Sequence, residues 1–405
     1  MKIAQIDVNY GFSSTGKIVH DLHVGLKDKG HSVQAFFGRG SDSKLASVYK
    51  ISNDFEMLLH VVGTRITGFT GGYSPFATMN LLNRLRLFKP DIVHLHDLHG
   101  YFLNISPLVY YLKTNNIATV WTFHSDFMFT GKCGSALDCN KWQSHCYACP
   151  SLMDYPKTLF FDQSAKMFDT KYKLFEDFVN LKIVTPSDWL ADRVRKSVIA
   201  GARDVSVISN GLDLDLFYPR EVMNTFSGIN WKEKFTVISV GSDFWSDLKG
   251  GKWILKLAER LPHVFFVMVG VDDRAIDVPA NVKLVRPIKD KNLLADFYSA
   301  ADVTLLTSKQ ETFSMVTAES LACGTPVIGF DSGAPKEVAP DGYGIFVSHG
   351  DIEGLERCIE GHMNNSINIK SPSECSAFVR AMYTKEKMVE KYECTYKNLI
   401  EEMEI

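Results

Sequence analysis

The chain has 405 residues, of which 45% are hydrophobic and 22% charged, and this length predicts two domains with sizeable cores. The formal net charge of −3 gives no basic footprint for nucleic acid, so we expect no nucleic-acid partner. No apolar run reaches membrane-spanning length and the first ten residues turn polar too soon for a signal peptide, so we expect a cytoplasmic protein with reduced thiols.

Short apolar runs that end in polar or turn residues alternate with helical patterns, as in α/β folds. The first series of expected strands comprises residues 2–8, 32–38, 91–97, 118–124, 181–187 and 205–211. The second series comprises residues 235–242, 263–270, 282–288, 301–308, 325–331 and 343–348. Helical stretches between the strands include residues 16–30, 250–261, 291–301 and 313–324. This alternation predicts right-handed β-α-β units and two parallel sheets.

Two successive series predict two Rossmann-like domains whose parallel sheets face each other across a cleft, where a ligand would bind. A stretch of weak periodicity that begins before Tyr218 separates the series. We therefore expect one domain over residues 1–218 and another over residues 219–387. The amphipathic tail, residues 388–405, is predicted to be a helix that packs back on the first domain.

The loop after the first expected strand has an ambiguous glycine pattern. Residues 11–17 read GFSSTGK, with the G-x-x-x-x-G-K spacing of a phosphate-binding P-loop. That motif continues with Ser or Thr, whose hydroxyl binds Mg²⁺, whereas position 18 is Ile. His94 and His96 also interrupt the apolar strand before Asp97, a candidate Walker-B acid. The sequence therefore does not favour an ATPase or GTPase.

The densest polar motif reads SKQETFSMVTAESLACGTPVIGFDSGAPKEV and spans residues 308–338. Glu311 follows an expected strand, and Glu319 lies on the helix that is expected to begin near Ser314. Free N–H groups at the start of this helix can face a diphosphate. Glu319 can accept hydrogen bonds from paired ribose hydroxyls, and Glu311 from a sugar hydroxyl. Two isolated glutamates would more often be solvated, so it is the length of the motif that favours a nucleotide-sugar site.

This motif and several others resemble the retaining GT-B glycosyltransferases of family 4. The stretches that carry the resemblance are residues 91–105, 120–133, 139–150, 155–160, 185–194, 207–219 and 311–337. Those in the first half resemble a bacterial subfamily that builds capsule, O-antigen and colanic acid polysaccharides. The resemblance covers nearly the whole chain and implies an α/β GT-B fold. It makes residues 1–218 the acceptor side and residues 219–387 the nucleotide-sugar-binding domain.

The resemblance also implies roles for individual residues. It assigns donor binding to Gly16, Lys249, Glu311, Phe313, Ser314 and Glu319, and catalysis to His124, Lys249 and Glu311. A cation such as Lys249 would stabilise charge on the departing nucleoside diphosphate. His124 would contact the donor sugar or the reacting centre, and Gly16 would let the backbone approach the bound substrate. The resemblance implies no catalytic metal.

Acceptor recognition is expected at Asp97 and His99, because both follow a strand. Strand alternation places His94 and His96 on the same strand face, where each is either a core residue or part of the site. The basic and apolar stretch 79–90 has two interpretations, a helix packed on the sheet or a surface that docks on an anionic membrane; we favour packing.

Four cysteines cluster within residues 131–152, which we interpret as an insertion in the first domain. Cys133, Cys139, Cys146 and Cys149 supply soft ligands that close on a C-x2-C, which suits a tetrahedral structural Zn²⁺. His145 is an alternative ligand. Two disulfides or free thiols remain as other interpretations.

The resemblance implies a hexosyltransferase that moves a sugar from a GDP- or UDP-sugar to a growing glycan, with retention of configuration. The implied acceptor is a glycan or an undecaprenyl-diphosphate-linked oligosaccharide, reached by peripheral contact with the inner membrane. Alternatives of the same architecture are a hydrolase or phosphorylase, a nucleotide-sugar epimerase, and a non-catalytic partner that binds sugar nucleotides.

Overall fold

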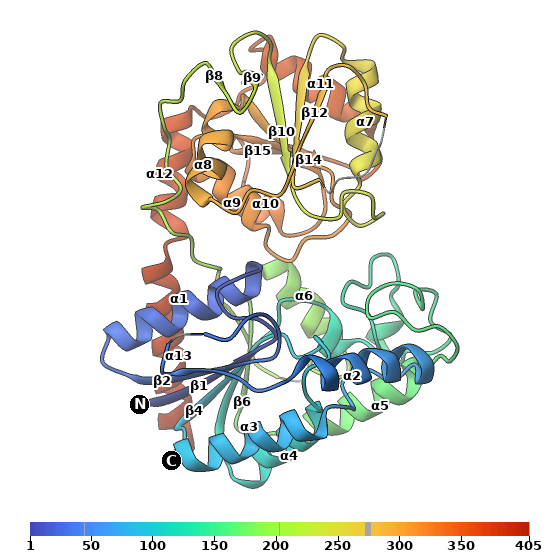
Figure 1. Ribbon diagram of the computed structural model, residues 1–405, viewed down its shortest axis with the longest axis vertical. Coiled ribbons are helices and arrows are strands. Elements are labelled where there is room, and N and C mark those ends of the chain that lie inside the picture. Colours follow the sequence, from blue (N-terminus) through green and yellow to red (C-terminus); the bar gives the residue numbers. More distant parts are fainter. Residues whose placement is uncertain (44, 202, 272–276, 405) are drawn as a thin grey trace. The chain divides into compact units, whose positions relative to one another are not determined.

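The computed structural model describes residues 1–43, 45–201, 203–271 and 277–404. They form two compact units (Figure 1). Unit 1 comprises Met1–Ser209 together with the C-terminal segment from Lys385, and unit 2 comprises Asn210–Thr384. The division falls between Ser209 and Asn210, before the boundary expected after Tyr218. The segment that begins at Asn210 packs with unit 2. Leu212, for example, forms a bridge with Thr384.

Unit 1 is built on a parallel sheet that contains seven strands among the described residues, in the order β3-β2-β1-β4-β5-β6-β7. Its strands are β1 (Lys2–Asp7), β2 (Ser32–Phe37), β3 (Val48–Lys50), β4 (Ile92–Leu95), β5 (Ala118–Thr122), β6 (Leu181–Thr185) and β7 (Val205–Val207). Its helices are α1 (Ser14–Asp28), α2 (Asp54–Thr67), α3 (Pro75–Phe88), α4 (Ile105–Thr114), α5 (Ser164–Phe175), α6 (Asp188–Lys196) and α13 (Lys385–Glu404). Of two 3-10 turns, Phe127–Phe129 precedes the cysteine-rich segment and Lys141–Gln143 lies within it.

Helices cover both faces of this sheet, because successive strand residues alternate between two apolar cores. Ile3 packs with α1 and α13, whereas Ala4 packs with α3, α4, α5 and α6. On the α13 side, the Tyr396 hydroxyl bonds His94 Nδ1 at 2.6 Å, and the Tyr392 hydroxyl bonds Thr122 Oγ1 at 2.8 Å. The final helix is therefore an integral part of unit 1.

Unit 2 contains a second parallel sheet, six-stranded within the described residues, in the order β12-β11-β10-β13-β14-β15. Its strands are β10 (Thr236–Val240), β11 (Phe265–Val269), β12 (Val282–Val285), β13 (Val303–Leu306), β14 (Val327–Phe330) and β15 (Gly344–Val347). Its helices are α7 (Gly251–Arg260), α8 (Lys291–Ala300), α9 (Met315–Ala322), α10 (Pro335–Val338), α11 (Ile352–Met363) and α12 (Pro372–Met382). A small antiparallel pair, β8 (Thr225–Phe226) and β9 (Ile229–Asn230), precedes the sheet.

The strand order reverses once in each sheet, and these reversals position the candidate sites. In unit 1 the chain moves outward from β1 to β2 and β3, then returns to place β4 on the other side of β1. In unit 2 the same happens at β10, which lies between β11 and β13. In open α/β sheets the crevice at such a reversal, outside the carboxyl ends of the strands, is where ligands bind. The prediction of α/β units with parallel sheets is confirmed.

Candidate active site

In unit 2 the reversal brings two oppositely charged side chains together. Lys249 follows β10 and directly precedes the N-terminal end of α7, and Glu311 follows the neighbouring strand β13. The Lys249 Nζ lies 2.6 Å from Glu311 Oε1. Both side chains are partly exposed, Lys249 at 31% and Glu311 at 18%. An accessible cation beside an accessible carboxylate can bind a ligand that carries both anionic groups and hydroxyls.

Hydrogen bonds to backbone carbonyls fix the positions of these two loops. The Thr307 hydroxyl donates to the Lys249 carbonyl at 2.9 Å, and the Lys309 amide donates to the Leu248 carbonyl at 2.8 Å. Gly250 has φ of 68°, and a Cβ there would lie 2.5 Å from the Thr307 carbonyl oxygen. Glycine is therefore required at this position, both for its left-handed backbone and for the close approach of the loops.

Helix α9 begins at Met315, shortly after Glu311 in the chain. Ser314 caps the helix, since its hydroxyl accepts a hydrogen bond from the Thr317 amide at 3.3 Å. Glu319 lies on α9, is only 8% exposed, and accepts a hydrogen bond from the Tyr298 hydroxyl at 3.2 Å. The side chain of Phe313 lies in the core, where its ring contacts Tyr383. Phe313 can therefore reach a ligand only through its backbone.

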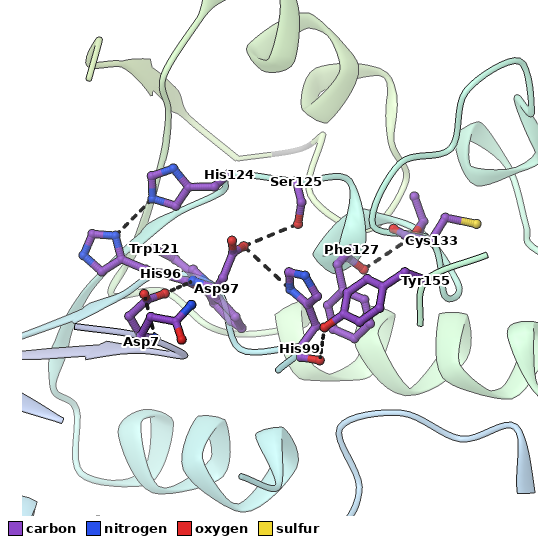
Figure 2. Close-up of polar contacts among 12 residues, drawn as sticks. Asp7, His96, Asp97, His99, Trp121, His124, Ser125, Phe127, Cys133 and Tyr155 are labelled. Carbon is purple, nitrogen blue, oxygen red and sulfur yellow. Dashed lines mark hydrogen bonds and ion pairs between the residues drawn. The ribbon is translucent and has the colours of Figure 1, made fainter. Parts of the chain in front are cut away.

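In unit 1 the ends of β1, β4 and β5 gather a second set of polar side chains (Figure 2). Asp7 ends β1 and is fully buried. Its Oδ1 accepts the Asp97 amide and its Oδ2 accepts the Asn9 amide, each at 3.1 Å. Asp7 thus joins the loop after β1 to the loop after β4. Burial, together with the neighbouring Asp97 carboxylate, raises the pKa of Asp7 to about 8.

The loop after β5 contributes His124, which stacks against a histidine of the loop after β4. The His96 and His124 rings lie 5.4 Å apart at 11°, and His96 Nδ1 is 3.1 Å from His124 Nε2. Burial lowers the pKa of both imidazoles, so both are neutral near pH 7. Among the described residues, His96 Nε2 is a buried atom without a hydrogen-bond partner. Buried polar atoms are rarely left unsatisfied, so this nitrogen is consistent with a site that receives a ligand or water.

Asp97 and His99 lie in the same group, as Figure 2 shows. Asp97 Oδ1 accepts the Ser125 hydroxyl at 3.4 Å and lies 3.7 Å from His99 Nδ1. The His99 ring stacks on Phe127 with centroids 5.0 Å apart, and the Tyr155 hydroxyl donates to the His99 carbonyl. The structure therefore places Asp97, His99 and His124 together.

Other polar residues of this region have structural surroundings. Asp126 is fully buried and forms a bidentate pair with Arg193, with its Oδ1 3.2 Å from Nε and its Oδ2 2.8 Å from Nη2. His94 is buried between Thr122 and Tyr396. Both side chains therefore stabilise the fold.

Gly16 lies inside the first turn of α1 rather than in a loop. A Cβ at Gly16 would lie 2.9 Å from the Asn9 Cβ, so glycine allows α1 to pack closely on its own preceding loop. The role expected for Gly16, close approach to a ligand, stays a prediction.

Sequence reasoning missed Asp7, although it ends an apolar strand just as Asp97 follows one. The same rule of polar residues at strand ends would have found it.

The four clustered cysteines line one small hollow. Cys146 Sγ accepts the Gly131 amide at 3.2 Å, and His145 turns away to pair with Asp169 at 2.9 Å. Within the described ranges, no group of three or more His, Cys, Asp or Glu side chains is arranged to hold a metal ion. None of the four cysteines is in a disulfide. Bound zinc at these cysteines stays a prediction.

The stretch 79–90 forms most of α3. Thr78, Leu81 and Leu85 of this helix are buried, as packing on the sheet requires. In the part of the chain that the structure describes, no helix is both long and apolar enough to cross a membrane.

Comparison with known proteins identifies the protein family of both units. The family model for glycosyltransferase family 4 matches residues 15–216, and the model for glycosyl transferases group 1 matches residues 234–365. A putative colanic acid biosynthesis glycosyl transferase, WcaC of Escherichia coli K12, is 24% identical over 98% of this chain and 100% of its own length.

Solved structures share the fold across the chain. Sucrose-phosphate synthase from Thermosynechococcus elongatus has a TM-score of 0.71 at 18% identity over 98% of each chain. HepE from Anabaena, solved in complex with UDP-glucose, has a TM-score of 0.66 at 14% identity over 98% of this chain and 100% of that chain. Matched by glycosyltransferase models in both parts and sharing this fold from end to end, the chain belongs to the GT-B glycosyltransferases of the family 4 and group 1 type.

Proposed function

We propose that unit 2 binds a nucleotide-sugar donor and that the enzyme transfers its sugar to a growing surface polysaccharide with retention of anomeric configuration. The observation that carries this proposal is the pair Lys249–Glu311, 2.6 Å apart at the strand reversal of unit 2 and next to the N-terminal end of α9. A diphosphate requires positive charge and a sugar requires hydrogen-bond acceptors, and this place offers both.

In the proposed complex the diphosphate replaces Glu311 as the partner of Lys249. The first amides of α9 add hydrogen bonds and a favourable dipole for the same phosphates. Glu311 then accepts hydroxyls of the donor sugar, and the buried Glu319 accepts the ribose hydroxyls. Charge that develops on the leaving nucleoside diphosphate is stabilised by Lys249, because the ammonium is already positioned before the reaction.

We assign the polar group of unit 1 to the acceptor and to the donor sugar. His124 is a neutral imidazole, so it can hydrogen-bond a hydroxyl without adding charge. Asp97 is the nearby carboxylate: it accepts the Ser125 hydroxyl, and its backbone amide donates a hydrogen bond to Asp7. No residue is assigned as a covalent nucleophile. The retained configuration would follow from attack on the same face of the sugar, aided by the leaving phosphate.

The acceptor is proposed to be a lipid-linked oligosaccharide at the cytoplasmic face of the membrane. Similarity to a protein described as a colanic acid biosynthesis glycosyl transferase supports a surface-polysaccharide acceptor of this kind. The donor would be a GDP- or UDP-sugar, and a glycan without its lipid would be a poorer acceptor.

Release of nucleoside diphosphate tests this function directly. Purified enzyme is incubated with a panel of GDP- and UDP-sugars, with and without lipid-linked glycan extracted from bacteria. We expect diphosphate release that depends on the acceptor, and NMR of the product should show the anomeric configuration of the donor. Release of free sugar without an acceptor would indicate a hydrolase, and conversion of one nucleotide sugar into another would indicate an epimerase.

A further inference from the structure

Helix α2 of unit 1 turns its apolar face to the solvent. Its large apolar side chains at Phe55, Leu58, Leu59, Val62 and Ile66 are exposed, and Phe55 is 71% exposed. These positions follow the spacing of one face of a helix, which in a surface helix normally packs on the core. The side chains that α2 buries are instead polar, namely Glu56, His60 and Thr64. The helix is therefore inverted relative to an ordinary amphipathic helix.

Buried hydrogen bonds hold α2 in this orientation. The Glu56 carboxylate accepts the Phe76 amide at 2.8 Å and the Ala77 amide at 3.1 Å, at the N-terminal end of α3. His60 accepts the Gly71 amide at Nε2, at 3.3 Å, and bonds the Ser74 hydroxyl through Nδ1, at 2.8 Å. Rotating α2 to bury its apolar face would break these contacts and leave a carboxylate unpaired. The outward apolar face is therefore enforced by the fold.

The exposed face continues beyond α2. Phe76 and Met79 of α3 are exposed, and Phe76 lies where the Glu56 carboxylate caps that helix. At the other end of α2, the Leu159 amide bonds the Arg65 carbonyl at 2.9 Å, which brings the exposed run Leu159–Phe161 alongside. We call this surface the α2 face. It comprises Phe55, Leu58, Leu59, Val62, Ile66, Phe76, Met79, Leu159, Phe160 and Phe161.

Ten exposed large apolar side chains on adjacent elements exceed the scattered surface hydrophobics of an ordinary soluble protein, so the α2 face indicates a contact surface. Between Phe55 and Val62 the exposed part of α2 is apolar. A protein partner normally exchanges about one hydrogen bond per 100–200 Å² of interface, whereas lipid hydrocarbon requires none.

The charges beside the α2 face favour an anionic surface. Asp54 is paired with Lys50 at 3.2 Å, and the Asp162 carboxylate accepts the Cys149 and Ser164 amides. The exposed basic residues Arg65 and Lys166 lie at the same end of α2 as the Leu159–Phe161 run, and the Lys166 ammonium is 5.7 Å from the Phe69 ring centroid. Cations that flank an apolar face match the headgroups of anionic lipids.

We propose that the α2 face inserts into the headgroup region of a lipid bilayer that contains anionic lipids. This inference deepens the proposed function, on which its biological sense rests, because a lipid-linked acceptor would have to be met at such a bilayer. It differs from the interpretation of residues 79–90 as the docking segment, since α2 and the loop before α5 form most of the surface.

Vesicle flotation tests the proposal with the full-length protein. Vesicles of phosphatidylethanolamine and phosphatidylglycerol, and vesicles of phosphatidylcholine alone, are floated with the wild type and with Leu59→Glu/Val62→Glu. These side chains are exposed, so the double variant should fold normally. Met223→Glu in unit 2, also at an exposed apolar position, is the matched control. We expect binding to phosphatidylglycerol vesicles that falls at least about tenfold in the double variant and is unchanged in the control.

Equal flotation of the double variant and the wild type, or no flotation of the wild type, would overturn the proposal. A wild type that sediments as a dimer while the double variant sediments as a monomer would assign the α2 face to a second copy of the chain, and so would also overturn it. Binding of nucleotide sugars is measured on the same proteins. If flotation behaves as expected but no nucleotide sugar binds, the donor proposal fails and the membrane contact stands.

Discussion

Replacement of Lys249 by methionine removes the cation at the strand reversal of unit 2 and keeps most of the apolar stem. Two unit charges about 4 Å apart interact by about 4 kcal/mol at the effective dielectric constant of a protein surface. The Lys249 side chain is 31% exposed, so solvent screens part of this energy. We therefore expect a loss of about 2 to 3 kcal/mol of transition-state stabilisation, or roughly 30- to 150-fold in kcat/KM.

The assay is acceptor-dependent release of nucleoside diphosphate, with Lys252→Met as the matched control. Lys252 lies three positions further along the chain, where its ammonium pairs with Asp247 at 2.6 Å and its side chain is 58% exposed. That variant should stay within about twofold of the wild type, because surface ion pairs contribute little. Lys249→Arg should recover part of the lost rate. Equal rates for Lys249→Met and Lys252→Met would refute the assignment of Lys249 to the diphosphate.

Further predictions concern two buried carboxylates and the cysteine cluster of unit 1. The pKa of Asp7 is about 8 in the folded protein against 3.8 when unfolded, so the folded state binds the proton more tightly. The free energy of unfolding therefore falls as pH rises between these values. Between pH 6 and pH 8, urea unfolding should show the wild type losing about 2 kcal/mol more than Asp7→Asn; parallel profiles would contradict this. Arg193→Ala removes the bidentate cation from the buried Asp126 carboxylate and should cost about 3 to 5 kcal/mol in the same assay, whereas the surface variant Arg195→Ala should cost under about 1 kcal/mol; equal losses would argue against a structural pair. The cysteine spacing still predicts bound zinc, so elemental analysis of protein purified without chelator should find stoichiometric metal that Cys149→Ser reduces; metal-free wild type would exclude it.

Most strands of the two parallel sheets could be predicted, because buried parallel strands are short apolar runs that end in polar residues. The short edge strand β3 was missed. Glu311 also followed from this rule, since it lies shortly after a strand, whereas Lys249 was predicted from the family resemblance. The sequence does not show which strands become neighbours in a sheet. The meeting of Lys249 and Glu311 depends on β10 lying beside β13, and the junction of Asp7 with Asp97 depends on β1 lying beside β4.

One feature could not be predicted for a different reason, because apolar periodicity identifies one face of a helix but not whether that face points to the core or to the solvent. The apolar spacing of α2 is that of a core-facing helix, and its outward direction is set by Glu56 and His60 through partners outside the helix. Tertiary contacts therefore decide the direction in which α2 turns its apolar face.

The central claim is that acidic side chains of unit 2 hold a nucleotide sugar, and titration calorimetry of Glu319→Gln tests it most directly. The substitution keeps the size of the side chain and an acceptor for the Tyr298 hydroxyl, so the fold should persist, as circular dichroism can verify. We predict that the wild type binds at least one GDP- or UDP-sugar and that the variant binds it at least about tenfold more weakly. Unchanged affinity for that donor in Glu319→Gln would contradict the account.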